Sequence, residues 1–484
     1  MARLIAAILS AVVTFSAFGA AEAVKITTDK TVDSSSLESI IKDVYRLSGA
    51  KTNDEKAIAI YDYLHQSIFH LAYPNEKAPQ SVGPLKVLNV YGWGLCGGQH
   101  TVLKSLFETA GWDVRYRGWQ GHTTIETQYD GKWHYFDVFL KCYFWNKDKS
   151  SVVGQDDINA DASLVLDGAK DGRVPKNSYL CCGDDAPGIV KGCKGTKPNA
   201  ISKHEDGWAS VTGRDQNYSP LLTLRSGAAL KLEWKNEPGM MVADGAKGGA
   251  HTCGNKDYRH DPVLGPLYEH YGPRAYANGS FTYAPDFSKA ADVADIELTK
   301  VKADGGKLVA DGQGTAIFKM NLSYPYAKAQ LDATFEGEGK LSISSDSGKT
   351  WQTAAAGDIS AQVRQKYDVW LKAEFSGSLS KLALSATIEH NRGVQPYLLN
   401  GKNTITVATK DNAIPVGGTL TVTYAYQEAT APAKRNQYNG AGITYGETKT
   451  VSKEITSSPC TFDIDVGGNT PPKMLYIERA LKGK

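Results

Sequence analysis

The sequence predicts an α+β protein in which a helix-containing amino-terminal core is followed by all-β sandwich modules. Before about residue 110, apolar residues recur with the period of an amphipathic helix, whereas after residue 216 they alternate with the period of a strand. The 48 Gly and 25 Tyr residues also favour turns and strands over a helical bundle. A chain of 484 residues is long enough for about three domains, each with its own core.

The numbers of positively and negatively charged residues are nearly equal. Lys and Arg together number 54 and Asp and Glu 52, so the formal net charge is +2. This balance gives no electrostatic reason to expect nucleic acid or an anionic membrane as a partner. With 41% hydrophobic and 22% charged residues, the composition also excludes wholesale disorder.

The amino end has the pattern of a secretory signal peptide. Arg3 precedes an apolar run over residues 4–20, and Ala21-Glu22-Ala23 fits the small-x-small cleavage pattern. We expect residues 1–23 to be removed and the mature protein to begin near Val24, secreted, periplasmic or on the cell surface, without stable membrane insertion. The alternative is an uncleaved anchor helix, although the run is slightly short for a membrane span.

Seven cysteines, an odd number, leave at least one unpaired in an oxidising compartment. Four lie close enough in sequence to form a local disulfide framework, namely Cys181, Cys182, Cys193 and Cys253. The alternative is a metal site that uses those thiols with His251 or His260, but the paired C-x-x-C ligand spacing is missing. The other three are Cys96, Cys142 and Cys460, of which Cys460 is isolated in sequence and is expected to be buried or paired at long range.

Three amphipathic helices are expected before residue 111. Ser35-x-x-Glu38 and Thr52-x-x-Glu55 are capping boxes that open the first two. A third apolar stripe begins at Val102, and Cys96 stands at the amino end of that helix with glycines on both sides. Helix-terminal N–H groups favour a thiolate, and glycines allow a substrate backbone to approach. A buried or disulfide-bonded structural cysteine is the alternative.

A hairpin with a calculable register follows the third helix. Asp130-Gly131 between two alternating segments predicts a two-residue turn, so that paired residue numbers sum to 261. Asp137 then lies opposite Thr124, and His122 lies diagonal to it on the same face. Diagonal neighbours are about 7–8 Å apart at the backbone, which is within side-chain reach. A nucleophilic Cys needs such an imidazole as base and such a carboxylate to orient it.

Other histidines compete for the role of base. His134 falls on the opposite face of the hairpin, which counts against it. His100 lies four residues after Cys96 on the same helix face, but the sequence offers it no orienting acid. His122 and Asp137 also have a purely structural interpretation as polar hairpin residues.

Together these elements resemble the core of the transglutaminase-like superfamily over about residues 35–145. The elements that carry the resemblance are Gly94-Leu-Cys96, the segment 111–116, Gly121-His122 and the segment 133–137. The resemblance implies a papain-like fold, with Cys96 as nucleophile, His122 as general base and acid, and Asp137 as orienting carboxylate. Thr123-Thr124 departs from the small and aromatic residues common there, which concerns the acceptor pocket more than the triad.

The implied chemistry is attack of the Cys96 thiolate on an amide carbonyl, giving a thioester that water or an amine resolves. The backbone N–H of Cys96 supplies one oxyanion donor. Trp93, Gln99 and Trp119 are candidates for the second donor or for substrate contacts. No cofactor and no metal are needed for this reaction.

We therefore expect a secreted enzyme that cleaves amide bonds as a protease or amidase on a protein or peptide substrate, including glycosylated or cell-wall material. Two alternatives stay open: a transglutaminase that cross-links Gln side chains to amines, and a non-catalytic adhesion protein whose β modules bind glycan or protein. The oligomeric state and the identity of the substrate do not follow from the sequence.

The expected division is a catalytic domain over residues 24–215, one β-sandwich module over 216–315 and one or more over 316–484. Within the loop-rich segment 146–215, Asp157-x-Asn159-x-Asp161 is similar to the start of a Ca²⁺ loop, but its Gly and Glu positions are not met. The segment 344–351 resembles an Asp-box, S-x-D-x-G-x-T-W, which predicts a structural hairpin. Because it occurs once, a sialidase-type propeller is disfavoured.

Overall fold

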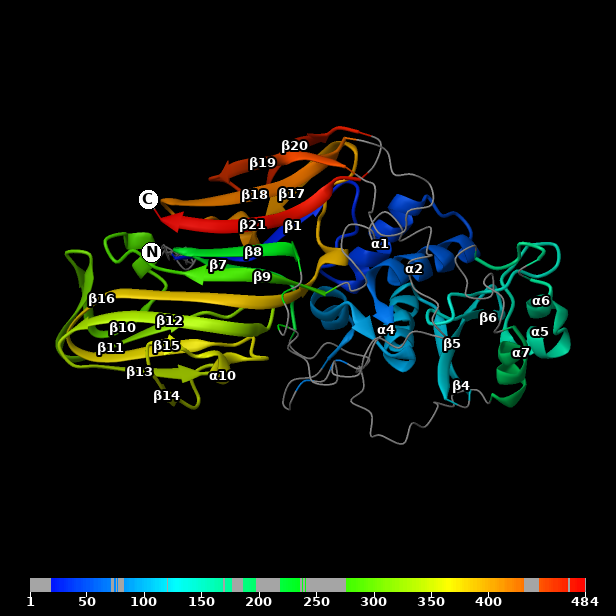
Figure 1. Cartoon of the computed structure of the whole chain (residues 1–484), viewed down its shortest axis with the longest axis horizontal. Helices are drawn as coiled ribbons and strands as arrows, with labels where there is room; N and C mark the ends of the chain where they lie inside the picture. The colour runs from blue at the N-terminus through cyan, green and yellow to red at the C-terminus, as the bar shows by residue number, and fades with distance from the viewer. Residues whose placement is uncertain are drawn as a thin grey trace, which may run out of the picture.

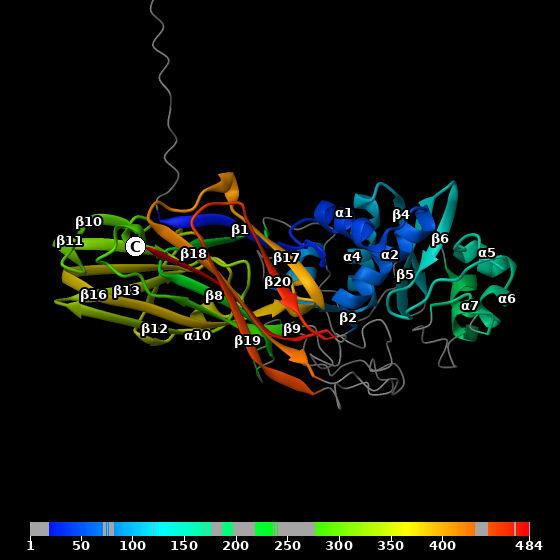
Figure 2. The ribbon, with the colours of Figure 1, turned by 90° about the horizontal axis from the view of Figure 1, so that it is seen from above.

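The structure is a computed structural model that describes residues 19–70, 74, 76, 82–119, 121–168, 170–175, 186–196, 218–235, 237, 240, 276–430, 444–468 and 471–483. A helical part and a β part lie end to end, and both views separate them clearly (Figure 1; Figure 2). The expectation of an α+β protein with extensive antiparallel sheets is confirmed.

The helical part contains the elements that surround Cys96. Its helices are α1 Leu37–Ser48, α2 Asn53–Ser67, α3 Pro84–Lys86, η1 Val87–Tyr91, α4 Cys96–Thr109, α5 Gln155–Ala160, α6 Ser163–Leu166 and α7 Ala186–Gly195. The capping box of Thr52 and Glu55 opens α2 as predicted. The cap of α1 is Ser36 rather than Ser35, because the Ser36 hydroxyl accepts the N–H of Ser39.

A three-stranded antiparallel sheet packs beside α4. Its strands are β4 Asp113–Trp119, β5 His122–Tyr129 and β6 Lys132–Phe136, while β2 Phe69–His70 and β3 Trp93–Gly94 form a short parallel pair. Tyr129 pairs with Lys132 and Ile125 with Phe136, which confirms the predicted hairpin register. Asp130 and Gly131 adopt positive φ at the turn, as a two-residue hairpin of this type requires.

The β part consists of two antiparallel sheets, of four and twelve strands. Its strands are β1 Ala20–Thr28, β7 Leu222–Arg225, β8 Ala228–Lys235, β9 Tyr276–Tyr283, β10 Glu297–Asp304, β11 Lys307–Lys319, β12 Tyr326–Glu336, β13 Gly339–Ser344, β14 Gln352–Ala354, β15 Gly357–Asp358, β16 Trp370–Asn391, β17 Gly401–Ala408, β18 Gly418–Ala429, β19 Tyr445–Ile455, β20 Cys460–Val466 and β21 Lys473–Gly483. The described helices here are short: α9 Ala290–Val293, α10 Ser360–Val363, η4 Arg392–Val394 and η5 Lys410–Asn412.

The strands do not follow the expected module boundary at residue 315. That position lies inside β11, which pairs with β16, and β16 also pairs with β9. β9 and β8 continue through β21 to β18, so strands from both sides of the boundary share the twelve-stranded sheet. A period of two identifies strands but does not reveal which distant strand each one pairs with.

The amino-terminal strand belongs to the β part. β1 lies between β17 and β7 in the four-stranded sheet, so the chain crosses into the helical part and returns. Ala20 and Ala21 pair with β7 upstream of the predicted cleavage point, whereas residues 25–28 pair with β17. Cleavage after Ala23 stays a prediction. It would remove the first of these pairings and keep the second.

The predicted hairpin at residues 344–351 forms between β13 and β14. The Asp346 carboxylate accepts the hydroxyl of Ser344 at 2.7 Å and the backbone N–H of Thr350 at 2.9 Å, and Gly348 adopts positive φ. The segment therefore shapes a turn, in agreement with its structural interpretation.

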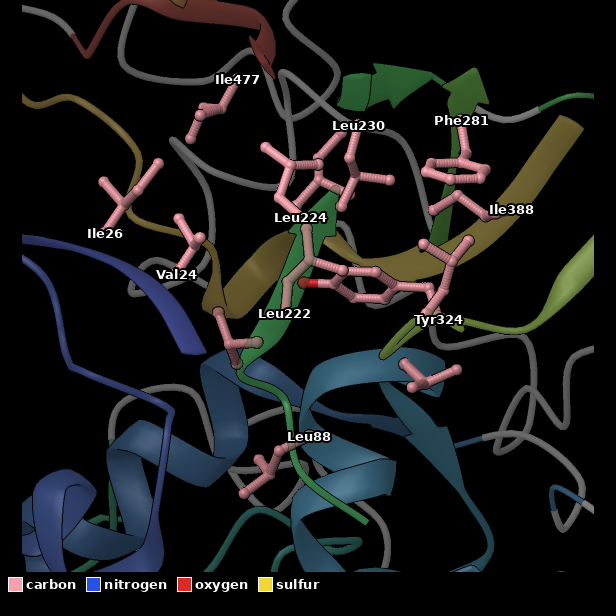
Figure 3. Close-up of a cluster of buried hydrophobic side chains, with 14 of the residues drawn as sticks. Val24, Ile26, Leu88, Leu222, Leu224, Leu230, Phe281, Tyr324, Ile388 and Ile477 are labelled. Carbon is pink, nitrogen blue, oxygen red and sulfur yellow. The ribbon is translucent and has the colours of Figure 1, made fainter. Parts of the chain in front are cut away.

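A hydrophobic cluster joins the two parts (Figure 3). Leu88 comes from η1 of the helical part, while Val24, Leu222 and Ile388 come from β1, β7 and β16. The amide of Asn391, at the end of β16, donates to the carbonyl of Ser67 at 2.8 Å and to that of Leu88 at 2.6 Å. Apolar packing and buried hydrogen bonds thus fix the orientation of the helical part.

Candidate functional site

Cys96 opens helix α4, as its sequence context predicts. Leu95 is the N-cap residue, and the first N–H groups of α4, including that of Cys96, have no acceptor within the helix. The side chain is a free thiol in a residue that is 5% exposed. The helix terminus supplies a positive electrostatic potential beside this side chain.

His122 begins β5 and faces Asp137, which follows β6. The two side chains meet with 2.7 Å between Nε2 of His122 and Oδ2 of Asp137. Asp137 is fully buried, so this contact is shielded from solvent. The diagonal relation expected from the hairpin register is therefore the contact found in the structure.

Nδ1, the other ring nitrogen of His122, is buried and has no hydrogen-bond partner among the described residues. The Cys96 side chain interacts with the same imidazole and favours its protonated form. Thiol, imidazole and carboxylate thus come together in the order that nucleophilic catalysis requires, with Nε2 held by the carboxylate.

His122 and Asp137 each stabilise the charged form of the other. Burial lowers the pKa of His122, but the Asp137 carboxylate and the Cys96 side chain outweigh burial and raise this pKa to about 10. Burial raises the pKa of Asp137, but the His122 imidazolium outweighs burial and lowers it to about 2. The geometry therefore favours an imidazolium and a carboxylate over a neutral pair at physiological pH.

Two further donors hold the Asp137 carboxylate, and the sequence did not single them out. The Tyr135 hydroxyl donates to Oδ2 at 2.8 Å, and the backbone N–H of Leu140 donates to Oδ1 at 2.7 Å. Tyr135 alternates with Phe136 in the hairpin, and its position two residues before Asp137 places both side chains on one face of the strand. That spacing is the sequence signal for Tyr135, whereas nothing in the sequence marks Leu140.

His100 lies near the site but does not have the environment of a base. Nδ1 of His100 donates to the carbonyl of Cys96 at 2.7 Å, and Nε2 accepts the N–H of Val138 at 3.2 Å. Burial lowers the pKa of His100 to about 4, despite the Asp137 carboxylate 3.7 Å from Nε2. Both ring nitrogens are therefore engaged, and His100 connects α4 to the chain after β6.

His134 lies apart from these residues, as its face of the hairpin predicts. Its Nδ1 is 2.6 Å from the carbonyl oxygen of Val152, and its Nε2 is 3.1 Å from that of Tyr129. The ring stacks on Tyr129 with 3.6 Å between centroids. These contacts fasten the hairpin turn to the following loop.

The three substrate candidates occupy different positions. Trp93 on β3 and Gln99 on α4 are buried, and Trp93 Nε1 and Gln99 Oε1 have no hydrogen-bond partner among the described residues. Trp93 thus retains a donor that is not used by the protein, as an oxyanion contact needs, whereas the unpaired atom of Gln99 is an acceptor. Thr123 Oγ1, next to His122, is buried and unpaired as well.

Trp119 packs against the imidazole of His122. Its ring meets that of His122 edge-on with 5.2 Å between centroids, and Phe139 meets the imidazole at the same separation. Helix α7 approaches the indole of Trp119 so closely that a Cβ on Gly192 would lie 2.4 Å from it. No sequence pattern predicted that α7 reaches this site.

A buried ionic network holds the sheet of β4, β5 and β6 to helix α5. Glu126 on β5 is fully buried, and its carboxylate lies 2.7 Å from Arg115 and 3.2 Å from Arg117. The same carboxylate accepts the N–H of Gln155, the first residue of α5, at 2.7 Å. Strand-to-helix contacts of this kind support the loop that carries Asp137.

Cys193 and Cys460 are free thiols in the structure. Cys193 is buried in α7, and Cys460 is half-buried on β20. Cys181, Cys182 and Cys253 lie outside the described residues, as do His251 and His260, so the disulfide framework and its metal-binding alternative stay predictions. Within the part of the chain that the structure describes, no group of three or more His, Cys, Asp or Glu side chains is placed to hold a metal ion.

Comparison of the chain with protein-family models, with curated protein sequences and with solved structures gave no match. Among the described residues, no helix has both the length and the apolar composition needed to cross a bilayer.

Proposed function

We propose that the protein is a secreted cysteine enzyme of the transglutaminase-like type that hydrolyses amide bonds through a thioester. The observation that supports this most is the grouping of Cys96 at a helix amino end with a His122 imidazole that Asp137 holds at 2.7 Å. The order of a Cys-headed helix followed by antiparallel strands with His and Asp agrees with the resemblance noted from sequence.

The reaction begins with Sγ of Cys96 attacking the amide carbonyl carbon. The carbonyl oxygen gains negative charge and is met by the backbone N–H of Cys96 and by Nε1 of Trp93. As the C–N bond breaks, the His122 imidazolium gives its proton to the departing nitrogen, and a thioester and a neutral imidazole result.

Water completes the cycle. His122 takes a proton from the water as its oxygen attacks the thioester carbonyl, and the C–S bond breaks. The carboxylic acid product leaves, and the thiolate and imidazolium are restored. Asp137 stays ionised throughout and fixes the orientation of the imidazole through Nε2.

Labelling with iodoacetamide tests the nucleophile. At pH 6.5 we expect one rapidly modified cysteine, mapped by peptide mass spectrometry to Cys96, and loss of that modification in His122→Ala. Cys460→Ser is the matched control, because it removes a half-buried free thiol far from the site and should leave the labelling rate unchanged. Labelling of Cys96 no faster than that of Cys460 would support a non-catalytic protein instead.

A second assay separates hydrolysis from cross-linking. The purified protein is incubated with casein and a fluorescent primary amine, and both new carboxyl groups and amine incorporation are measured. We expect hydrolysis that depends on Cys96, without incorporation. Incorporation of the amine into Gln side chains would favour a transglutaminase.

A further inference from the structure

Arg479 on β21 is a buried cation in the core of the β part. It is 5% exposed, and its strand neighbours on the same face, Ile477 and Leu481, are fully buried. Its register partners on the adjoining strands, Leu230 and Val422, are fully buried too. The side chain therefore points into the apolar interior, where an arginine is rarely found without a partner.

No carboxylate in the described part of the chain neutralises this guanidinium. Among the described residues, no carboxylate forms an ion pair with Arg479, and its Nε is buried without a hydrogen-bond partner. Two other enclosed arginines differ, since Arg225 pairs with Asp295 at 2.9 Å and Arg117 with Asp156 at 2.9 Å. A buried charge with no counter-charge is unfavourable unless something else supplies one.

A small cavity adjoins the guanidinium. Its volume is about 40 Å³, and Arg479 lines it together with Tyr324, Asn89 and residues of β1 and of the loop after it. The Tyr324 hydroxyl points toward β7 at this place (Figure 3). Burial raises the pKa of Tyr324 and the Arg479 charge opposes that rise, so the two side chains are close.

The cavity carries a net positive charge. Its charged lining side chains are Lys25, Asp33 and Arg479, and Lys25 pairs with Asp33 at 3.0 Å. That pair cancels, so the Arg479 charge is left. The volume exceeds the roughly 10–15 Å³ that one water needs, and it accommodates a single small anion.

We propose that this cavity binds a small monovalent anion, either chloride or a carboxylate of the size of acetate, held by Arg479 and Tyr324. The guanidinium is weakly hydrated and presents a fork of donors suited to such an ion. The bound anion would connect β21, β1 and Asn89 of η1, and so would strengthen the contact between the β part and the helical part. The inference is independent of the chemistry at Cys96.

Thermal unfolding at constant ionic strength tests this proposal. Sodium gluconate, whose anion is too large for the cavity, is replaced stepwise by sodium chloride in one series and by sodium acetate in another. We expect Tm to rise with saturation in at least one series, and the series that responds identifies the ion. In Arg479→Met the rise should disappear.

Arg225→Met is the matched control, because it removes an arginine that already has a carboxylate partner. It should keep the response to the anion. An equal response in Arg479→Met, or no response in the unmodified protein, would overturn the proposal.

If Arg479→Met does not fold, crystals of the unmodified protein in sodium bromide provide a second measurement. An anomalous peak within hydrogen-bond distance of the Arg479 guanidinium supports the site. Water density alone at that position, with the bromide ordered elsewhere, would contradict it.

Discussion

Asp137 organises the candidate site because one buried carboxylate accepts three hydrogen bonds. His122, Tyr135 and the backbone of Leu140 each donate to it, at 2.7, 2.8 and 2.7 Å. Burial of a carboxylate is unfavourable without such donors, and these three keep it ionised. The charge on Asp137 in turn keeps the imidazole of His122 protonated.

The pH dependence of stability should report the protonation of His122. Its pKa is raised from 6.5 to about 10, so its contribution to stability is complete below pH 6.5 and is lost as the pH rises through 10. We therefore expect the difference in Tm between the unmodified protein and His122→Gln to be largest near pH 6 and to shrink toward pH 10. A constant difference over this range would mean that His122 is neutral in the folded protein.

Tyr135→Phe should affect both turnover and its pH profile. The change removes one donor from the Asp137 carboxylate, which then attracts the imidazolium proton more strongly, so the alkaline limb of kcat should move to higher pH. The loss of a hydrogen bond to a charged group should also lower stability by about 1.5–3 kcal/mol.

Tyr129→Phe is the control for this change, because its hydroxyl donates to Asp54 away from Cys96. It should cost stability while leaving the pH profile unchanged. Identical pH profiles for Tyr135→Phe and the unmodified protein would reduce Tyr135 to a packing residue.

The sequence was sufficient to predict that Cys96, His122 and Asp137 lie together, but not to predict the groups around them. Cys96 followed from a helix start flanked by glycines, and His122 and Asp137 followed from the hairpin register, because both rules are local. The hydrogen bonds of His100 depend on where α4 meets the chain after β6, and no local pattern determines that contact. The sequence thus left His100 open as a base, and the structure shows both its nitrogens engaged.

Among the elements, helix α7 has the clearest effect on the site. The helix passes over Trp119 at Gly192, and Trp119 contacts the ring of His122. The hairpin and the first helices were predictable because caps, turns and periods are encoded within a few residues of each other. The contact between α7 and β4 joins segments about 70 residues apart. A short glycine-containing helix such as α7 has no local sequence pattern from which this contact could be predicted.

Gly192→Ala should impair the site through Trp119. The added methyl group would lie 2.4 Å from the indole, so either the ring, which contacts His122, or α7 must move. We expect a loss of about 1–3 kcal/mol in stability. We also expect a lower rate of Cys96 alkylation at pH 6.5.

Gly188→Ala in the same helix is the matched control, since its added methyl group meets no atom within 4 Å. It should leave the alkylation rate unchanged and should not reduce stability. If both variants behave alike, the approach of α7 to Trp119 has no influence on the imidazole.

For the whole molecule, the main departure from the sequence-based prediction is that the parts are not consecutive. The described part of the chain starts with β1 in the β part, continues into the helical part and then returns to the β part. Within it, a cut after residue 23 or 215 therefore does not separate complete units. Strand periodicity marked the β residues, but sheet order depends on pairing between segments hundreds of residues apart. β1 pairs with β17, and β8 with β21, across such distances.

Leu88→Ala tests whether the two parts unfold as one unit. Leu88 comes from the helical part and is fully buried. It belongs to the same hydrophobic cluster as Val24, Leu222 and Ile388 of the β part (Figure 3). Removing its side chain leaves a cavity at this junction, which should cost about 2–5 kcal/mol. Because Asn391 also forms hydrogen bonds across the junction, we expect calorimetry to show a single transition that moves to lower temperature as a whole.

Leu47→Ala, at a position on α1 that is 40% exposed, is the control and should change stability by less than about 0.5 kcal/mol. Two separate transitions, of which only one responds to Leu88→Ala, would show that the helical part and the β part are independently stable.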